Sequence, residues 1–189
     1  MIRIAILGDI GSGKSYVSRK FGYPVFNADN EVGKLYSKDK KVFKKLNKIL
    51  PNYIDSFPIN KEQIIKAVLA NKQNLKKIVF IVHREIRRKM NIFLKRNKNR
   101  KIVILDIPLF LENKLNKKRD ILVFIQSNKS LVLKKIKKRK NFNLKILKKF
   151  KSIQLPLDYK KNKSQYIIKN DFSPISVKKG IKIILDEIL

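Results

Sequence analysis

The segment Gly8–Ser15 limits what this chain can fold into more than any other part of the sequence. It reads Gly-Asp-Ile-Gly-Ser-Gly-Lys-Ser and fits the pattern G-x-x-x-x-G-K-[ST] at every fixed position. The apolar, β-branched run Ile2–Leu7 before it predicts a buried strand, and the four-residue spacing of Val17 and Phe21 after it predicts a helix. A strand, a glycine-rich turn and a helix in this order are the context in which the pattern forms a phosphate-binding loop.

The residue types of this segment suit the binding of a nucleoside triphosphate. Glycines let the backbone curve closely around phosphate oxygens and direct its N–H groups inward, and the amino end of the following helix adds a positive dipole. Lys14 would reach the β- and γ-phosphates, the Ser15 hydroxyl would bind Mg²⁺, and the Tyr16 backbone N–H would contact the α-phosphate. A chance glycine-rich turn between a strand and a helix is the alternative. We predict that this segment binds ATP and Mg²⁺, with Ser15 as the metal ligand. The predicted nucleotide-binding residues are Gly8, Gly11, Ser12, Gly13, Lys14, Ser15 and Tyr16.

Length and composition limit the class of protein. A chain of 189 residues predicts one compact domain with a sizeable core. The absence of cysteine excludes disulfides and thiolate metal sites, and a single histidine, His83, argues against zinc. The longest apolar stretch, 102–111, contains Asp106 and Pro108 and is too short to span a membrane. We therefore expect no membrane association and a cytoplasmic location.

The formal net charge of +33 is extreme and raises the question of nucleic-acid binding. The lysines are spread along the whole chain, and lysine, asparagine and isoleucine are all abundant, as in proteins from AT-rich coding sequence. Coding drift and a dedicated nucleic-acid surface are the two explanations, and we favour drift. The prediction is non-specific, salt-sensitive binding of polyanions without a specific nucleic-acid partner.

Hydrophobic patterns along the chain alternate between strands and helices. Apolar runs predict five strands, at 2–7, 23–26, 101–106, 121–126 and 166–169. Helical spacing predicts helices from Lys14, from the polar cluster 27–32 past Leu35, and at 39–50, 61–70, 73–95, 129–138 and 176–189. Strands separated by helices indicate an α/β fold with a parallel sheet. The helical block at 57–98 contains no predicted strand, so we interpret it as an insertion within a single domain, 1–189.

The loop pattern by itself does not separate kinases from GTPases or larger ATPases. The chain is short for a motor protein, and it lacks the N-K-x-D segment that recognises guanine. The nearest approach is Asn97-Lys98-Asn99-Arg100, which has no aspartate. Small-molecule kinases are therefore the leading class.

Further segments resemble the dephospho-CoA kinase family nearly from end to end. The family has a D-A-D segment after the second strand, an H-P-x-I-R segment and a P-L-L-x-E segment, and this chain has similar residues at 27–29, 83–87 and 108–112. A family lid arginine corresponds to Arg139, and the family's later glutamine, lysine and asparagine fall on Gln154, Lys160 and Asn170. The departures are Asn27 in place of an acidic residue, Arg84 in place of proline, and Ser164-Gln165 in place of Ala-Asp.

The resemblance implies a P-loop kinase-type three-layer fold with a helical substrate-binding insertion at 57–98 and a small lid at 137–160. It implies transfer of the ATP γ-phosphate to the ribose 3′-hydroxyl of dephospho-CoA. Asp29 would orient that hydroxyl and take its proton, and Lys14 and Arg139 would stabilise the transferring phosphate. The implied acceptor-binding set is Asp29, His83, Arg87, Pro108, Leu109 and Glu112.

Each of these residues also has a structural alternative. Asp29 would serve as a helix N-cap, Pro108 as a helix start, His83 as a packed structural side chain, and Arg139 as part of a solvated charge run. Asp106 would either hold Mg²⁺ through water or simply end its strand. Two functional alternatives also remain, namely another nucleoside or nucleotide kinase of the same fold and a basic nucleic-acid-binding P-loop ATPase. We favour a monomer.

Overall fold

The computed structural model describes residues 1–138 and 142–189, which divide into two compact units. The first unit contains residues 1–27, 97–143 and 150–189, apart from the three undescribed positions. The second contains residues 28–96 and 144–149. The predicted insertion, 57–98, lies inside the second unit except for its last two residues.

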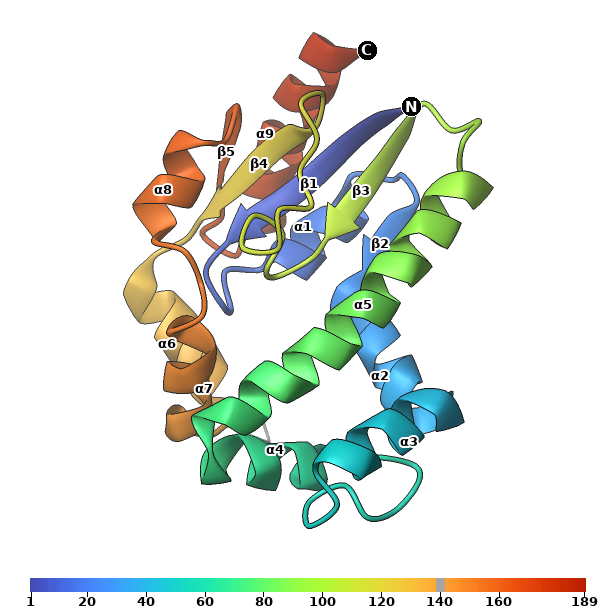
Figure 1. The fold of residues 1–189 in the computed structure, drawn as a ribbon. Coiled ribbons are helices and arrows are strands. Elements are labelled where there is room, and N and C mark those ends of the chain that lie inside the picture. The colour runs from blue at the N-terminus through green and yellow to red at the C-terminus, as the bar shows by residue number, and fades with distance from the viewer. Residues whose placement is uncertain (139–141) are drawn as a thin grey trace. The chain divides into compact units, whose positions relative to one another are not determined.

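A five-stranded parallel sheet forms the centre of the first unit. Its strands lie in the order β2-β3-β1-β4-β5 and every neighbouring pair is parallel (Figure 1). The strands are β1 (Ile2–Gly8), β2 (Val25–Asn27), β3 (Ile102–Asp106), β4 (Ile121–Gln126) and β5 (Tyr166–Lys169). All five predicted strands are therefore present, with β2 shifted slightly toward its carboxyl end.

Helices cover this sheet because its strands are apolar on both faces. On one face, Ile4 and Ile6 of β1 form a buried cluster with residues of α1 (Lys14–Lys20) and α9 (Pro174–Ile188). The alternate residues Ala5 and Leu7 are buried as well. The remaining helices of this unit are α6 (Lys129–Lys137) and α8 (Leu157–Asn162), while α7 (Leu144–Lys151) crosses the unit boundary. The predicted α/β fold class is confirmed.

The second unit is helical. It contains α2 (Ala28–Lys38), α3 (Lys40–Ile49), α4 (Lys61–Ala70) and the long α5 (Lys72–Arg96). Apolar residues at three- or four-residue spacing on α5 are buried: Leu75, Ile78, Val82, Ile86 and Met90.

Local capping explains where two of these helices begin. The Asp39 carboxylate accepts hydrogen bonds from the Lys41 and Val42 amides at the start of α3. Asn60 and Gln63 form a reciprocal capping box at the start of α4.

Two short helices were absent from the sequence prediction. No helix is predicted for the segment that contains α7, because its closely spaced lysines obscure the apolar period of Leu144, Leu147 and Phe150. Helix α8 has only six residues after Pro156, too few for a periodic signal. No helix in the described part of the chain is both long and apolar enough to cross a membrane.

Candidate active site

The loop between β1 and α1 has a backbone that requires glycine. Gly11 and Gly13 have φ angles of 83° and 89°, a region that L-residues with side chains rarely adopt. A Cβ at Gly13 would lie 2.4 Å from Asn170 Nδ2, and a Cβ at Gly11 would lie 2.6 Å from Ile136 Cδ1. The loop is therefore confined both by its own conformation and by its surroundings.

Side chains from two other strand ends hold the loop in place. The Ser12 carbonyl accepts hydrogen bonds from Asn170 Nδ2 at 2.8 Å and from Ser127 Oγ at 2.9 Å. Asn170 follows β5 and Ser127 follows β4, so the carboxyl ends of three strands meet at the loop. Asn170 was noted in sequence through the family resemblance. Ser127 was missed, since nothing local distinguishes a serine after a strand.

The Lys14 side chain is folded over its own loop and is buried. Its Nζ donates hydrogen bonds to the carbonyls of Gly8 at 3.2 Å and Asp9 at 2.6 Å. Asp9 also pairs with the half-exposed Lys151 at 3.2 Å. The bonds to the two carbonyls place the ammonium group beside the loop backbone, where an anion held by the loop would meet it.

The other predicted loop contacts have defined partners in this structure. The Tyr16 amide donates to the Gly13 carbonyl at 3.0 Å, and the Ser12 amide donates to the Asp9 carbonyl at 3.2 Å. The Tyr16 ring packs against the core cluster, with Lys20 Nζ 5.5 Å from the ring centre. Phosphate contacts from Ser12 and Tyr16 stay predictions.

Three polar side chains meet beside the first turn of α1. Asn27 at the end of β2 lies in register with Asp106 at the end of β3, and its Nδ2 donates to Asp106 Oδ2. The same Nδ2 lies 3.5 Å from Ser15 Oγ. Asp106 is buried, with 2% of its surface exposed. Hydroxyl and carboxylate oxygens are the donors that Mg²⁺ prefers, so this set fits the predicted ion.

The second unit carries Asp29, His83 and Arg87. Asp29 is exposed and is the second residue of α2, inside its first turn, so the N-cap alternative considered from sequence is wrong by position. His83 and Arg87 lie one turn apart on α5, the first half-buried and the second exposed. Within the unit, α5 therefore presents His83 and Arg87 along one helical face.

An ion pair connects the two helices that carry these residues. Lys89 of α5 lies 3.2 Å from Glu31 of α2, which also pairs with Lys34 at 2.6 Å. Partial burial acts to raise the pKa of Glu31, but hydrogen bonds and charge from Lys34 and Lys89 outweigh it and lower the pKa. The carboxylate thus stays charged and fastens α2 to α5.

The segment after β3 contains Pro108, Leu109 and Glu112. Pro108 and Leu109 are half-buried, and Glu112 Oε1 accepts hydrogen bonds from Lys160 Nζ at 2.6 Å and from the Leu155 amide at 2.9 Å. Lys160 is 1% exposed. Glu112 Oε2 is buried and has no hydrogen-bond partner among the described residues.

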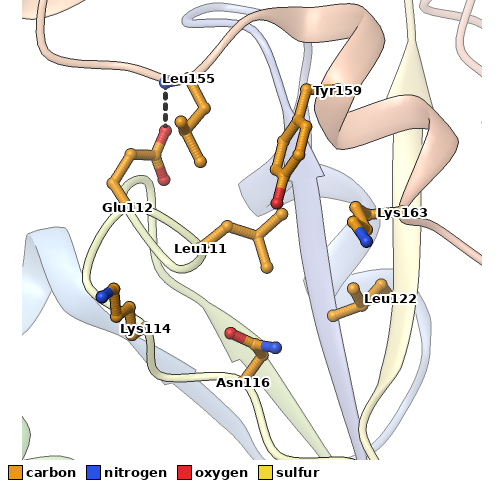
Figure 2. Close-up of a pocket in the computed structure, with 8 residues that line it drawn as sticks. All are labelled: Leu111, Glu112, Lys114, Asn116, Leu122, Leu155, Tyr159 and Lys163. Carbon is orange, nitrogen blue, oxygen red and sulfur yellow. Dashed lines mark hydrogen bonds between the residues drawn. The ribbon is translucent and has the colours of Figure 1, made fainter.

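Glu112 also lines a pocket of about 390 Å³ within the first unit. Figure 2 shows the carboxylate of Glu112 at one end of this pocket and Tyr159 beside Leu111. Leu122 on its wall lies near the amino end of β4, whereas the glycine-rich loop follows the carboxyl end of β1. The pocket is therefore distinct from the phosphate-binding loop. Its lining is Leu111, Glu112, Lys114, Asn116, Leu122, Leu155, Tyr159 and Lys163.

Arg139, the predicted lid arginine, lies outside the described residues. Among the described residues, no group of three or more histidine, cysteine, aspartate or glutamate side chains could hold a metal ion.

Comparison with known proteins identifies the family. The sequence model of dephospho-CoA kinase matches residues 2–175. The chain belongs to the dephospho-CoA kinase family. A dephospho-CoA kinase from Wolbachia sp. subsp. Brugia malayi is 32% identical over 190 aligned residues, which cover 98% of this chain and 97% of the relative. Another from Wolbachia pipientis wMel is 30% identical, with the same coverage.

Solved structures agree on the fold. A Thermus thermophilus protein has a TM-score of 0.79 at 23% identity, covering 100% of this chain and 98% of its own. Dephospho-CoA kinase from Campylobacter jejuni has a TM-score of 0.62 at 24% identity, covering 98% and 96%. Shikimate kinase from Acinetobacter baumannii has a TM-score of 0.53 at 17% identity, covering 100% and 93%. The predicted P-loop kinase fold and the assignment to an ATP-dependent kinase family are confirmed.

Proposed function

We propose that this chain transfers the γ-phosphate of ATP to the ribose 3′-hydroxyl of dephospho-CoA and thereby forms coenzyme A. One observation carries the proposal. A complete phosphate-binding loop, with Gly11 and Gly13 at positive φ in confined surroundings and Lys14 folded over it, lies in a chain that matches the family over 2–175.

The nucleotide site consists of the loop and the start of α1. Backbone amides of the loop and the Lys14 ammonium group bind the phosphates, because fixed donors and a buried charge stabilise negative charge that develops during transfer. A bound Mg²⁺ would supply positive charge that offsets the negative charge of the phosphates. The Ser15 hydroxyl would hold it directly and the Asp106 carboxylate through water.

Six residues make up the proposed acceptor set. Asp29 orients the ribose hydroxyl and accepts its proton, and His83 and Arg87 contact the acceptor. Pro108, Leu109 and Glu112 shape the acceptor pocket. The support for these roles is the family resemblance at 27–29, 83–87 and 108–112.

The same resemblance supports the wider assignments. The chain acts as one kinase domain, 1–189, in which 57–98 binds the acceptor and 137–160, including Arg139, forms a lid that excludes water. We further propose a monomer that works in the cytoplasm.

An acceptor screen tests the proposal. A coupled assay measures ADP release with ATP, Mg²⁺ and one acceptor at a time: dephospho-CoA, adenosine, AMP or shikimate. We expect turnover with dephospho-CoA alone. Preferred phosphorylation of another acceptor would assign the chain to a different kinase class, and stimulation by DNA or RNA alone would support the nucleic-acid-dependent ATPase.

A Lys14→Ala variant tests the nucleotide site in the same assay. Removing the ammonium group should lower turnover by about 100-fold or more without unfolding the protein. Lys20→Ala, at the exposed end of the same helix, is the matched control and should retain activity. Near-normal turnover in a folded Lys14→Ala protein would refute the assignment of the loop.

A further inference from the structure

Asn27 stands where the family has an acidic residue, and it connects two side chains that the proposed metal site uses. The register of β2 and β3 sets Asn27 opposite Asp106 at the carboxyl ends of both strands. Ser15, on the other side, is the second residue of α1. One amide group therefore lies between the hydroxyl and the carboxylate.

The orientation of this amide follows from its partner. The group that faces Asp106 Oδ2 is the Asn27 NH₂, which donates a hydrogen bond to this oxygen. The same NH₂ group lies 3.5 Å from Ser15 Oγ, at the outer limit of hydrogen-bond distance. A carboxylate at position 27 would lack this donor.

We propose that Asn27 is a positioning residue for the divalent ion, and that its neutral amide makes metal binding depend on the nucleotide. This inference rests on the proposed function only for the identity of the nucleotide. The NH₂ group donates to Asp106 and lies 3.5 Å from the Ser15 hydroxyl, so it connects the two side chains that would hold the ion. Among Ser15, Asn27 and Asp106, only Asp106 is then a carboxylate.

The low negative charge of the site is the reason that metal binding should depend on the nucleotide. Mg²⁺ dehydrates reluctantly and is usually held by one or two carboxylates together with the phosphates of a substrate. With Asn at position 27, one carboxylate and one hydroxyl attract the ion weakly until a polyphosphate adds its own charge. An aspartate there would bring a second carboxylate close to Asp106 and create a dianionic site able to capture the ion alone.

Titration of Mn²⁺ into the full-length protein, followed through the EPR signal of the free ion, measures this directly. Each protein is titrated alone and with saturating non-hydrolysable ATP analogue. Asn27→Asp should tighten nucleotide-free Mn²⁺ binding by about tenfold, and Asn27→Ala should weaken Mn²⁺ binding in the presence of the analogue by about tenfold. The affinity of Asn27→Ala for the analogue without metal should stay within about twofold of the parent. Asn30→Ala, in the first turn of α2, is the control and should match the parent.

The outcomes separate this inference from the proposed function. Parent-like nucleotide-free Mn²⁺ binding in Asn27→Asp, or parent-like Mn²⁺ binding with the analogue in a folded Asn27→Ala, would overturn the inference. If Asn27→Ala does not fold, Asn27→Asp decides. Failure to phosphorylate dephospho-CoA would refute the proposed function but leave these Mn²⁺ affinities unaffected.

Discussion

At Gly13 the backbone φ of 89° and the nearby Asn170 amide together exclude a side chain. The same amide holds the Ser12 carbonyl, so a larger residue at Gly13 would also break a bond that shapes the loop. Asn170 is buried, at 2% exposure, and its Oδ1 accepts a hydrogen bond from the Phe172 amide. Gly13 therefore serves the loop both through its backbone conformation and through the space that it leaves for the Asn170 side chain.

Asp29 is the residue whose proposed role is most directly separable from a structural one. Asp29→Asn keeps the size of the side chain but removes the proton acceptor. We expect acceptor phosphorylation to fall by about 100-fold or more and ATP affinity to stay within about twofold. Loss of a negative charge from the first turn of α2 should destabilise the protein by only about 0.3–1 kcal/mol. Steady-state turnover beside a thermal melt measures both effects.

Asp39→Asn is the matched control for this substitution. Asp39 caps α3, and asparagine caps a helix about as well as aspartate, so activity and stability should both persist. Parent-like turnover in Asp29→Asn would exclude Asp29 as the proton acceptor.

At the scale of elements, buried and exposed ion pairs connect segments that are distant in sequence. Glu112, in the segment after β3, pairs with Lys160 of α8, and both side chains are shielded from solvent. Glu85 of α5 pairs with the distant Lys45 of α3 and also with Arg88, one turn along the same helix, but the two cations are largely exposed. The Glu112–Lys160 pair should stabilise the fold more than the pairs of Glu85, because solvent screens the exposed charges.

Lys160→Met tests the buried pair. The substitution leaves the Glu112 carboxylate buried without its cation, and we expect a loss of about 3–5 kcal/mol in the free energy of unfolding. Chemical denaturation measures the change. Lys161→Met, at a half-buried neighbouring position of α8, should lower stability by no more than about 1 kcal/mol. Equal losses of stability in the two variants would show that the buried ion pair with Glu112 does not stabilise the fold.

Glu85→Gln tests the exposed pairs through pH. The hydrogen bond from Lys45 is the largest cause that lowers the pKa of Glu85, and partial burial opposes it. Because the folded-state pKa lies below the unfolded value of 4.5, the stabilisation is present above pH 4.5 and is lost as pH falls through the folded pKa. The variant should be less stable than the parent at pH 7, by about 0.5–1 kcal/mol, and the difference should vanish in acid.

Urea unfolding at several pH values and salt concentrations checks this expectation. Raised salt should shrink the difference at pH 7 as well, since both cations are exposed. Glu62→Gln, at an exposed position on α4, controls for the loss of one carboxylate. A difference that grows toward acid pH would contradict the assigned sign.

At the scale of the whole molecule, the net charge of +33 is the dominant property. Its field should attract ATP and any other polyanion, so binding to DNA by itself does not indicate a nucleic-acid function. The distinguishing property is the response of binding to salt and to base sequence.

We expect DNA affinity to fall by about 1,000-fold or more between about 50 and about 200 mM salt, with no preference among unrelated sequences. Fluorescence anisotropy with several labelled duplexes measures both properties, and phosphorylation of dephospho-CoA should persist over the same range. Tight binding to one sequence at physiological salt would instead support a dedicated nucleic-acid surface.

The sequence by itself determined the strands, most helices and the phosphate-binding loop, because each depends on neighbouring residues. Apolar runs give strands buried on both faces, and the glycines of 8–15 supply a conformation that other residues avoid. The family resemblance added predicted roles for residues such as Asp29 and Glu112, which no local sequence pattern indicates. The helices at 144–151 and 157–162 escaped because lysine density and short length leave no clear period.

Only the tertiary structure decided which distant residues meet. Ser127 and Asn170 reach the Ser12 carbonyl because β4 and β5 end beside the loop, and Asn27 faces Asp106 because β2 pairs with β3 in a particular register. Strand order and register depend on long-range packing, where a one-residue shift would turn Asn27 to the opposite face. The proximity of Ser15, Asn27 and Asp106 at the proposed metal site could therefore not be predicted from the sequence alone.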